Sequence, residues 1–243
     1  MGDKEILISI VIATHNAERY LPDCLSSILN LSLPQTEVIV VDGLSDDGTV
    51  EILKHSKLPR LKWRSEPDQG IYDALNKGID MAAGKWLYFL GADDRLLPGF
   101  SALADELKDE NTIYYGNSLA WNEEGRKQAS ELLKGAFSCY RLAKYCMNHQ
   151  SILYPAKAFE KTKYNLKYKI LADYAHNLML WGDKSYIKAY YPIDIVAYHM
   201  GGISSNYDDL IFEEDKPRLI LRHMGLNVFL RYMFRKLKDR IKR

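Results

Sequence analysis

Four short apolar segments divide the first part of the chain, and polar residues follow each of them. They span residues 6–14, 36–42, 61–66 and 85–90. The first, second and fourth are almost unbroken runs of aliphatic and aromatic side chains, a pattern typical of strands that are buried on both faces of a parallel sheet. We therefore expect four strands in this region.

The segments between these strands have helical character. Leucine and isoleucine recur at helical spacing within residues 17–31, and residues 46–56 open with aspartates that are typical of a helix start. Residues 71–84 form a third helical pattern that a glycine closes. Strands that alternate with helices predict a parallel, doubly wound α/β sheet over residues 1–100.

The pattern changes in the second half of the chain. Strands are expected over residues 112–121, 126–133, 150–155, 185–191 and 194–200, and a helix over residues 170–182. Because no linker or repeat separates these elements from the first half, we expect one domain over residues 1–215, in which residues 101–215 wrap onto the same sheet. Residues 216–243 are interpreted as a basic, amphipathic helical tail.

Composition places the chain among soluble globular proteins, since 47% of its 243 residues are hydrophobic and 27% are charged. The formal net charge of +1 gives no indication of nucleic-acid binding. The charge is unevenly distributed, because residues 222–243 contain eight lysines and arginines but one aspartate. That segment therefore carries a formal charge of +7 and leaves −6 on the rest of the chain.

Three cysteines, Cys24, Cys139 and Cys146, show no metal-ligand spacing and are odd in number, which favours reduced thiols and a cytoplasmic location. The N-terminal segment is acidic and its apolar run is short, unlike a secretory signal. No run approaches the ~18 apolar residues that a membrane-spanning helix needs. We expect a cytoplasmic protein unless another feature tethers it to a membrane.

Polar residues gather at the carboxyl ends of the four predicted strands, the edge at which open α/β sheets bind ligands. They are residues 14–16, 42–43, 66–70 and 91–94. The neighbouring carboxylates Asp93 and Asp94 repel each other, so they indicate either a solvated loop or a cation site that a negatively charged ligand completes. The first loop lacks GxGxxG and GxxxxGK[ST], which argues against a dinucleotide site and a P-loop.

Several segments together resemble the nucleotide-sugar half of glycosyltransferase family 2 enzymes. They are VIATHNAERYLPDCLSSI (11–28), VIVVDGLSDDGTVEIL (38–53), SEPDQGIYDALNKGIDMAAGKW (65–86) and FLGADD (89–94). The resemblance is strong over residues 6–100. The later segments NHQSILYP, ADY and AYHMGGISS are similar to the acceptor half, with less specificity. The subgroup that the chain most resembles builds bacterial surface polysaccharides and includes colanic-acid-type transferases.

The resemblance implies the GT-A fold, an α/β architecture with a Rossmann-like, mostly parallel central sheet and flanking helices, here with an added C-terminal amphipathic helix. It also implies that Asp94 binds Mn²⁺ or Mg²⁺ between the donor phosphates, and that Asp93 contacts the ribose or an outer-shell water. Hard divalent cations prefer such carboxylate and phosphate oxygens. The family often has Asp-x-Asp-Asp at this point, whereas this chain has Gly91 in place of the first Asp.

By the same resemblance, Thr14, His15 and Asn16 hold the nucleotide base, and Asp42 accepts a hydrogen bond from a base N–H. The family often has Asp-Asp where this chain has Asp42-Gly43, so uracil, guanine and thymine all stay open.

Asp68 and Asn76 have two interpretations: contacts to the donor phosphates and sugar, or ordinary polar residues of a loop and a helix surface.

The resemblance also places the catalytic base at Asp173, where Ala172 replaces the acidic neighbour that is usual in the family. A carboxylate there can take the proton of an acceptor hydroxyl, and a single displacement then inverts the anomeric carbon. The alternative is a helix cap, since Asp is common at helix starts. Whether His199 is a further metal ligand stays open.

Apolar residues of the tail recur at steps of three and four: Val228, Phe229, Tyr232, Met233, Leu237 and Ile241. Together with its basic residues, this pattern indicates that residues 226–243 bind an anionic membrane surface, with the protein peripheral at the inner face of the plasma membrane. The alternative is a helix that packs on the protein's own surface.

The leading hypothesis is an inverting, metal-dependent glycosyltransferase that moves a sugar from a nucleotide-sugar donor to a glycan or polyprenyl-linked acceptor. A sugar-nucleotide pyrophosphorylase is a second hypothesis, although residues 13–20 lack the glycine-rich basic loop of such enzymes. A catalytically inactive GT-A module, which binds a nucleotide sugar or scaffolds a membrane complex, is the non-enzymatic alternative.

Overall fold

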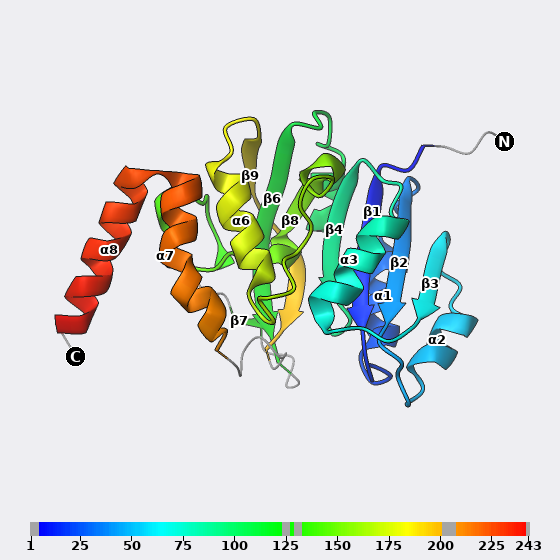
Figure 1. The fold of residues 1–243 in the computed structure, drawn as a ribbon. Coiled ribbons are helices and arrows are strands. Elements are labelled where there is room, and N and C mark those ends of the chain that lie inside the picture. The colour runs from blue at the N-terminus through cyan, green and yellow to red at the C-terminus, as the bar shows by residue number, and fades with distance from the viewer. Residues whose placement is uncertain (1–4, 123–126, 129–132, 201–207, 242–243) are drawn as a thin grey trace.

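The structure, a computed structural model, describes residues 5–122, 127–128, 133–200 and 208–241. A nine-stranded sheet runs through the molecule (Figure 1). In sheet order the strands are β3 (Leu61–Ser65), β2 (Thr36–Asp42), β1 (Ile8–Thr14), β4 (Trp86–Gly91), β8 (Ile152–Pro155), β6 (Thr112–Trp121), β9 (Ile187–His199) and β5 (Arg95–Leu96), and β7 (Lys127–Gln128) pairs with β6.

The four strands predicted in the first half are confirmed, and they are parallel. β1 lies between β2 and β4, and β3 pairs with the outer side of β2. The registers align their carboxyl ends, because Thr14 pairs with Asp42 and Asp42 pairs with Ser65. The polar residues that follow these strands therefore emerge along one edge of the sheet.

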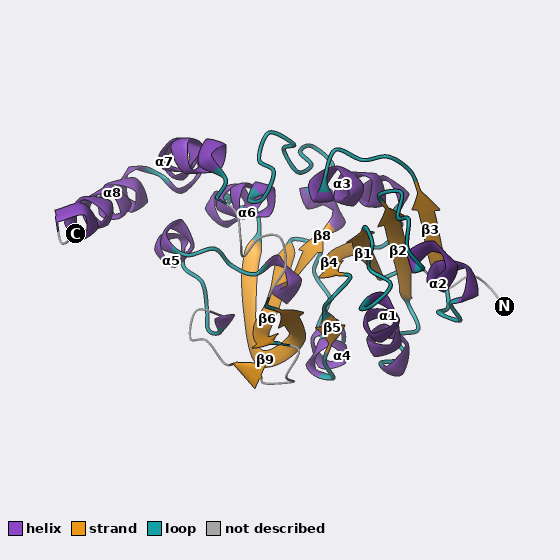
Figure 2. Cartoon of the chain, turned by 90° about the horizontal axis from the view of Figure 1, so that it is seen from below, coloured by secondary structure: helices purple, strands orange, loops and turns teal. Residues whose placement is uncertain are grey.

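Helices cover both faces of the sheet (Figure 2). α1 (Leu21–Asn30), α2 (Thr49–His55) and α4 (Gly99–Ala104) contribute to the core on one face, and α3 (Ile71–Met81), α5 (Cys139–Lys144) and α6 (Ala172–Gly182) to the core on the other. The strongly apolar strands pack against both layers, as their composition predicts. The six-residue helices α4 and α5 are too short to show helical periodicity in the sequence.

The second half of the sheet is mixed. β8 is antiparallel to both of its neighbours, β4 and β6, whereas β6 and β9 are parallel. Two strands were expected where the structure has the single strand β9, and that expectation was wrong. Pro192, which suggests a break, lies where the β6–β9 register shifts, so its missing N–H interrupts no ladder bond. Of the strand expected over residues 126–133, only β7 lies within the described residues and forms a strand.

Two helices follow at the end of the sheet opposite β3 (Figure 1). α7 (Leu210–Met224) begins before residue 216, so the expected start of the tail falls inside a helix that packs on α6. α8 (Leu226–Ile241) follows it directly. No helix in the described part of the chain is long and apolar enough to cross a membrane.

The apolar residues of α8 divide between two faces. Val228, Phe229 and Tyr232 pack against the protein core, as the alternative interpretation of the tail predicts. A second set is exposed, which we call the α8 stripe: Leu226, Leu230, Met233, Phe234, Leu237 and Ile241. Steps of three and four residues place this stripe on one side of the helix.

Candidate active site

The loops after β1 and β2 hold each other in place at the carboxyl edge. The Asn16 side-chain oxygen accepts a hydrogen bond from the backbone N–H of Asp46 at 3.0 Å, and the Asn16 N–H donates to Ser45 Oγ at 2.8 Å. Asn16 has a φ of 50°, which asparagine tolerates better than most residues. His15 and Asn16 are exposed, whereas Thr14 is buried and its hydroxyl has no partner among the described residues. Within the part of the chain that the structure describes, the Thr14 hydroxyl is thus an unpaired polar group just inside the carboxyl edge of the sheet.

Asp42 is fully buried, and its hydrogen bonds hold the residues at this edge of the sheet together. Its carboxylate accepts hydrogen bonds from the Ser65 hydroxyl at 2.6 Å, from the Ser45 N–H at 3.0 Å and from the Ser45 hydroxyl. These bonds connect the ends of β2 and β3. Contact with a nucleotide base requires this loop to open, so the base-binding role of Asp42 stays a prediction.

Gly43 makes room for Asp68. A Cβ atom at Gly43 would lie 2.5 Å from Oδ2 of Asp68, so the side chain fills the space that a larger residue would take. Oδ1 of Asp68 accepts the Gly70 N–H at 2.8 Å. The structure therefore places the Asp68 carboxylate beside the loop that Asp42 begins.

Asn76 is engaged elsewhere. Its Nδ2 donates to the carbonyl oxygen of Tyr164 at 2.9 Å, and its Oδ1 accepts the Tyr164 N–H at 3.0 Å. Both polar ends of the amide are used, which favours a structural role over a donor contact.

The Asp93–Asp94 pair lies just after β4, and its two carboxylates differ in exposure. The Asp93 side chain is about one-third exposed, whereas Asp94 is 2% exposed. Oδ2 of Asp94 accepts hydrogen bonds from Gln150 Nε2 at 2.7 Å and from the Gly91 N–H at 3.1 Å. Oδ1 accepts the His199 N–H at 2.8 Å. Burial, and then the charge of Asp93, raise the pKa of Asp94 to about 7 although these bonds oppose the rise.

His199, the last residue of β9, lies against this pair. Its Nδ1 is 3.4 Å from Oδ2 of Asp93, and its ring lies between those of Tyr20 and Trp121, with centroids 5.2 and 4.7 Å away. The aromatic rings fix the imidazole beside the carboxylates. The described residues nevertheless contain no cluster of three or more histidine, cysteine, aspartate and glutamate side chains that could hold a metal ion by itself.

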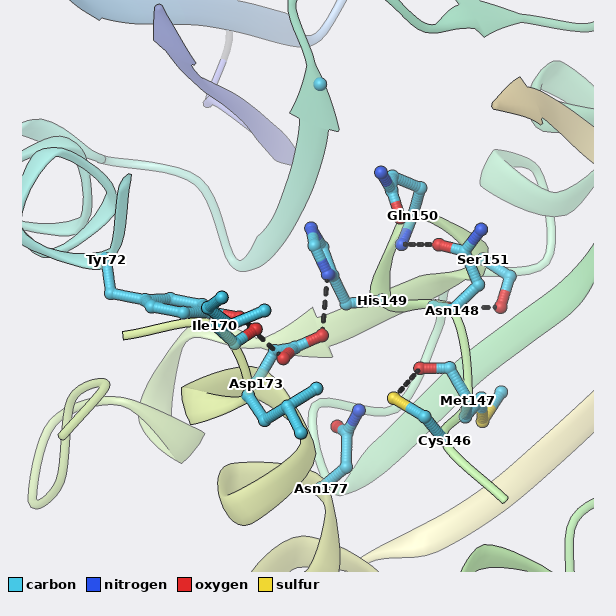
Figure 3. Close-up of polar contacts among 12 residues, drawn as sticks. Tyr72, Cys146, Met147, Asn148, His149, Gln150, Ser151, Ile170, Asp173 and Asn177 are labelled. Atoms are coloured by element: carbon cyan, nitrogen blue, oxygen red, sulfur yellow. Dashed lines mark hydrogen bonds and ion pairs between the residues drawn. The ribbon is translucent and has the colours of Figure 1, made fainter. Parts of the chain in front are cut away.

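Asp173 lies in the first turn of α6, and a second polar cluster surrounds it (Figure 3). Its Oδ2 is 2.8 Å from Nδ1 of His149, and its Oδ1 is 2.7 Å from the Tyr72 hydroxyl, which also lies 2.6 Å from the Ile170 carbonyl oxygen. Burial favours a higher pKa for Asp173, but His149 and then the Tyr72 hydroxyl outweigh it and lower the pKa below its ordinary value. The carboxylate is therefore held in its charged form.

His149 and Gln150 connect the two carboxylate clusters. They belong to a short 3₁₀ helix, η2 (His149–Ser151), whose start the Asn148 side chain caps. His149 contacts Asp173, and Gln150 contacts Asp94. Sequence reasoning gave little weight to these residues and missed Tyr72, because a lone histidine, glutamine or tyrosine carries no spacing signal. The order His149-Gln150 before a predicted strand was the one available clue.

Comparison with known proteins identifies the family of the chain. The sequence model of the family described as "Glycosyl transferase family 2" matches residues 9–181, more than half of the chain. The chain belongs to glycosyltransferase family 2. It is thus a transferase, and the pyrophosphorylase hypothesis is abandoned.

Relatives of this glycosyltransferase include enzymes of two kinds. The PGL/p-HBAD biosynthesis glycosyltransferase of Mycobacterium bovis BCG is 33% identical over 222 residues, which cover 87% of this chain and 84% of that protein. The chondroitin synthase of Pasteurella multocida is 28% identical over 69% of this chain, which corresponds to 18% of its own length.

Solved structures confirm the predicted GT-A type of α/β fold. The crystal structure of S. aureus TarS 1–349 in complex with UDP-GlcNAc has a TM-score of 0.66 and covers 90% of this chain and 67% of that one. At 18% sequence identity, the likeness concerns the fold alone.

Proposed function

We propose that this glycosyltransferase is an inverting, divalent-metal-dependent enzyme that moves a sugar from a nucleotide-sugar donor to a glycan or lipid-linked acceptor in surface polysaccharide or glycolipid biosynthesis. The observation that carries the proposal is the position of two carboxylate clusters, Asp93–Asp94 and Asp173, which one short segment connects. The biosynthetic names of the relatives and the UDP-GlcNAc bound to TarS support the substrate class.

The residues around Gly91 fit a hard divalent cation. A Cβ atom at Gly91 would lie 2.5 Å from Oδ2 of Asp94 and 2.9 Å from Oδ1 of Asp93, so both carboxylates converge on one small space. Burial and then the charge of Asp93 raise the pKa of Asp94, and a cation bound there would favour the charged form of both carboxylates. Mn²⁺ or Mg²⁺ commonly binds one or two carboxylates together with substrate phosphates. Asp94 and Asp93 would hold the ion, with His199 beside them.

Different residues would then bind the donor and remove the acceptor proton in a single displacement. Thr14, His15 and Asn16 would contact the nucleotide at the end of β1. A bound divalent ion would neutralise charge on the departing nucleoside diphosphate. The cluster around Asp173 would remove the proton of the acceptor hydroxyl as its oxygen attacks the anomeric carbon. A single attack of this kind leaves the product with the opposite anomeric configuration.

The α8 stripe supports an additional partner, an anionic membrane surface. Lys238 Nζ lies 4.8 Å from the centroid of the exposed Phe234 ring, so a basic side chain accompanies the exposed apolar residues. Apolar contact with lipid combined with attraction to anionic headgroups is the mode of an in-plane helix. Such a surface would bring the enzyme to a lipid-linked acceptor.

Turnover of a nucleotide-sugar panel tests the catalytic proposal. We expect wild type to release a nucleoside diphosphate in the presence of Mn²⁺ or Mg²⁺ and to stop when EDTA is added. Asp94→Asn removes a carboxylate that we assign to the ion, so its kcat should fall on the order of 10²-fold or more. NMR of the product should show inversion at the anomeric carbon.

Asp105→Asn is the matched control, because Asp105 is an exposed carboxylate at the end of α4. Its turnover should equal that of wild type. Full activity of Asp94→Asn in EDTA would contradict metal dependence, and retained configuration would contradict the single displacement. Turnover of no member of the panel by wild type would leave the inactive GT-A module as the better description.

A further inference from the structure

The hydrogen bonds of Asp173 occupy the carboxylate that sequence reasoning selected as the base. One oxygen faces the His149 ring and the other faces the Tyr72 hydroxyl. Asp173 is only 6% exposed, so little of it can touch an acceptor. The geometry therefore favours an indirect role for this carboxylate.

His149 has a free ring nitrogen in the same place. Figure 3 shows the His149 ring beside Asp173, with its second nitrogen directed away from the carboxylate. The side chain is 16% exposed, against 8% for Asp173, and among the described residues none forms a hydrogen bond with Nε2. A proton on Nδ1 that is donated to Asp173 leaves a lone pair on Nε2, which can accept a proton.

His149 also lies near the Asp93–Asp94 pair, to which we assign the metal ion. It lies near enough to Asp94 to interact with it electrostatically. The next residue, Gln150, contacts Asp94 directly. A base at His149 would thus face a sugar whose phosphates are held at Asp94.

We propose that Nε2 of His149 is the atom that takes the acceptor's proton, and that Asp173 is a positioning residue that orients the imidazole. This inference rests on the glycosyl transfer proposed above. As the acceptor oxygen bonds to the anomeric carbon, its proton moves to Nε2. The bond between the sugar and the phosphate oxygen breaks, and its electron pair stays on the nucleoside diphosphate. The Asp173 carboxylate stabilises the resulting imidazolium, as in other carboxylate–histidine pairs.

The test compares wild type with His149→Ala and His149→Gln, using the nucleotide sugar that wild type turns over, with Mn²⁺ and with water as the acceptor. We expect both variants to lose about 10²- to 10⁴-fold in kcat, because a general base contributes that much. The donor KM should change less than about threefold, because donor contacts stay in place. Added imidazole should restore part of the activity of His149→Ala, and more at pH 8 than at pH 6, where less free base is present.

His55→Ala is the control, since His55 is an exposed histidine on α2 that should neither lose activity nor respond to imidazole. If Asp173 itself took the proton, His149→Gln, which can still offer an N–H to that carboxylate, would stay within about threefold of wild type, and imidazole would restore nothing to His149→Ala. Those results would overturn the assignment. An inactive wild type would instead refute the proposed function. Thermal unfolding of both variants checks that they are folded.

Discussion

Buried carboxylates in this molecule differ in whether neighbouring groups stabilise their charged form. Glu37 in β2 is 1% exposed and accepts hydrogen bonds from Ser9 Oγ at 2.6 Å and the Ala83 N–H at 2.7 Å, with Lys62 Nζ 2.7 Å away. Burial favours a higher pKa for Glu37, but Lys62 and the two hydrogen bonds lower it overall. Asp94 is buried to a similar degree, yet its pKa is raised. The charged form of Glu37 thus stabilises the fold, whereas ionising Asp94 costs stability that binding of a cation would restore.

Glu37→Ala should destabilise the protein by about 1–3 kcal/mol at pH 7, because it leaves the buried Ser9 hydroxyl and the Ala83 N–H without their acceptor. The folded-state pKa of Glu37 is lowered, so its charge stabilises the fold above the unfolded pKa of about 4.3 and this contribution is lost as the pH falls through the folded pKa. The difference between wild type and Glu37→Gln should therefore shrink toward acid pH. Urea unfolding at pH 7 and pH 4 measures both effects.

Glu51→Ala is the comparison for that experiment, because Glu51 is an exposed residue of α2 whose ion pairs lie on the surface. It should change the free energy of unfolding by less than about 0.5 kcal/mol. A Glu37→Ala variant as stable as Glu51→Ala would show that the buried contacts contribute nothing.

At the scale of elements, the two faces of α8 have different surroundings. One face packs against the protein, so the helix is held in a fixed position. The other carries the α8 stripe, with Leu230 54% and Phe234 62% exposed. A second copy of this chain could also cover the stripe, but the basic residues of two facing helices would repel each other. Anionic lipid is the better match to both features.

Wild type should therefore co-sediment with phosphatidylglycerol vesicles more than with phosphatidylcholine vesicles, and less at high salt. The double variant Leu230→Ser/Phe234→Ser should bind the anionic vesicles on the order of 10²-fold less or weaker still, because each large side chain contributes about 1.5–3 kcal/mol on burial and about 1.4 kcal/mol is tenfold in affinity.

Ile187→Ser is the matched control, since Ile187 is 59% exposed at the start of β9. It should bind vesicles as wild type does. Light scattering on the same samples separates the two occupants: a wild-type dimer that the double variant dissociates, without vesicle binding, would mean that the stripe joins two copies.

At the scale of the whole molecule, both the parallel and the mixed half of the sheet contribute residues to the candidate site. Asp94 follows β4 of the parallel half, whereas Gln150, Asp173 and His199 come from η2, α6 and β9 of the mixed half. A donor bound at Asp94 would thus contact segments that lie far apart in the sequence. Ligands that bind only the folded state raise its stability by RT ln(1 + [L]/Kd).

A nucleoside diphosphate at 100 times its Kd should add about 2.7 kcal/mol, which corresponds to a rise in Tm of roughly 5–10 °C for a chain of this size. UDP, GDP and dTDP, each with and without Mn²⁺, should identify the base that the enzyme prefers. The shift should require Mn²⁺ and should be reduced in Asp94→Asn but not in Asp105→Asn. If no diphosphate shifts the transition, donor binding at this edge is contradicted.

The chain order of the parallel half could be predicted because local patterns specify it. Each of the segments 6–14, 36–42, 61–66 and 85–90 contains a strand, and polar loops follow them where the parallel topology requires a binding edge. β9 was mispredicted as two strands because the bulge that accommodates Pro192 depends on its partner β6. α7 was missed because Pro217 and its polar composition hide the helix.

The sequence by itself determined the family, the fold and the positions of Asp94 and Asp173, because these depend on motifs that are contiguous in the chain. Only the tertiary structure decided how the carboxylates are surrounded. His149 lies 24 positions before Asp173, and Tyr72 lies 101 positions before it, yet both contact its carboxylate. Burial and hydrogen bonding across such separations arise from packing, so the pairing of His149 with Asp173 could be recognised only after the chain was folded.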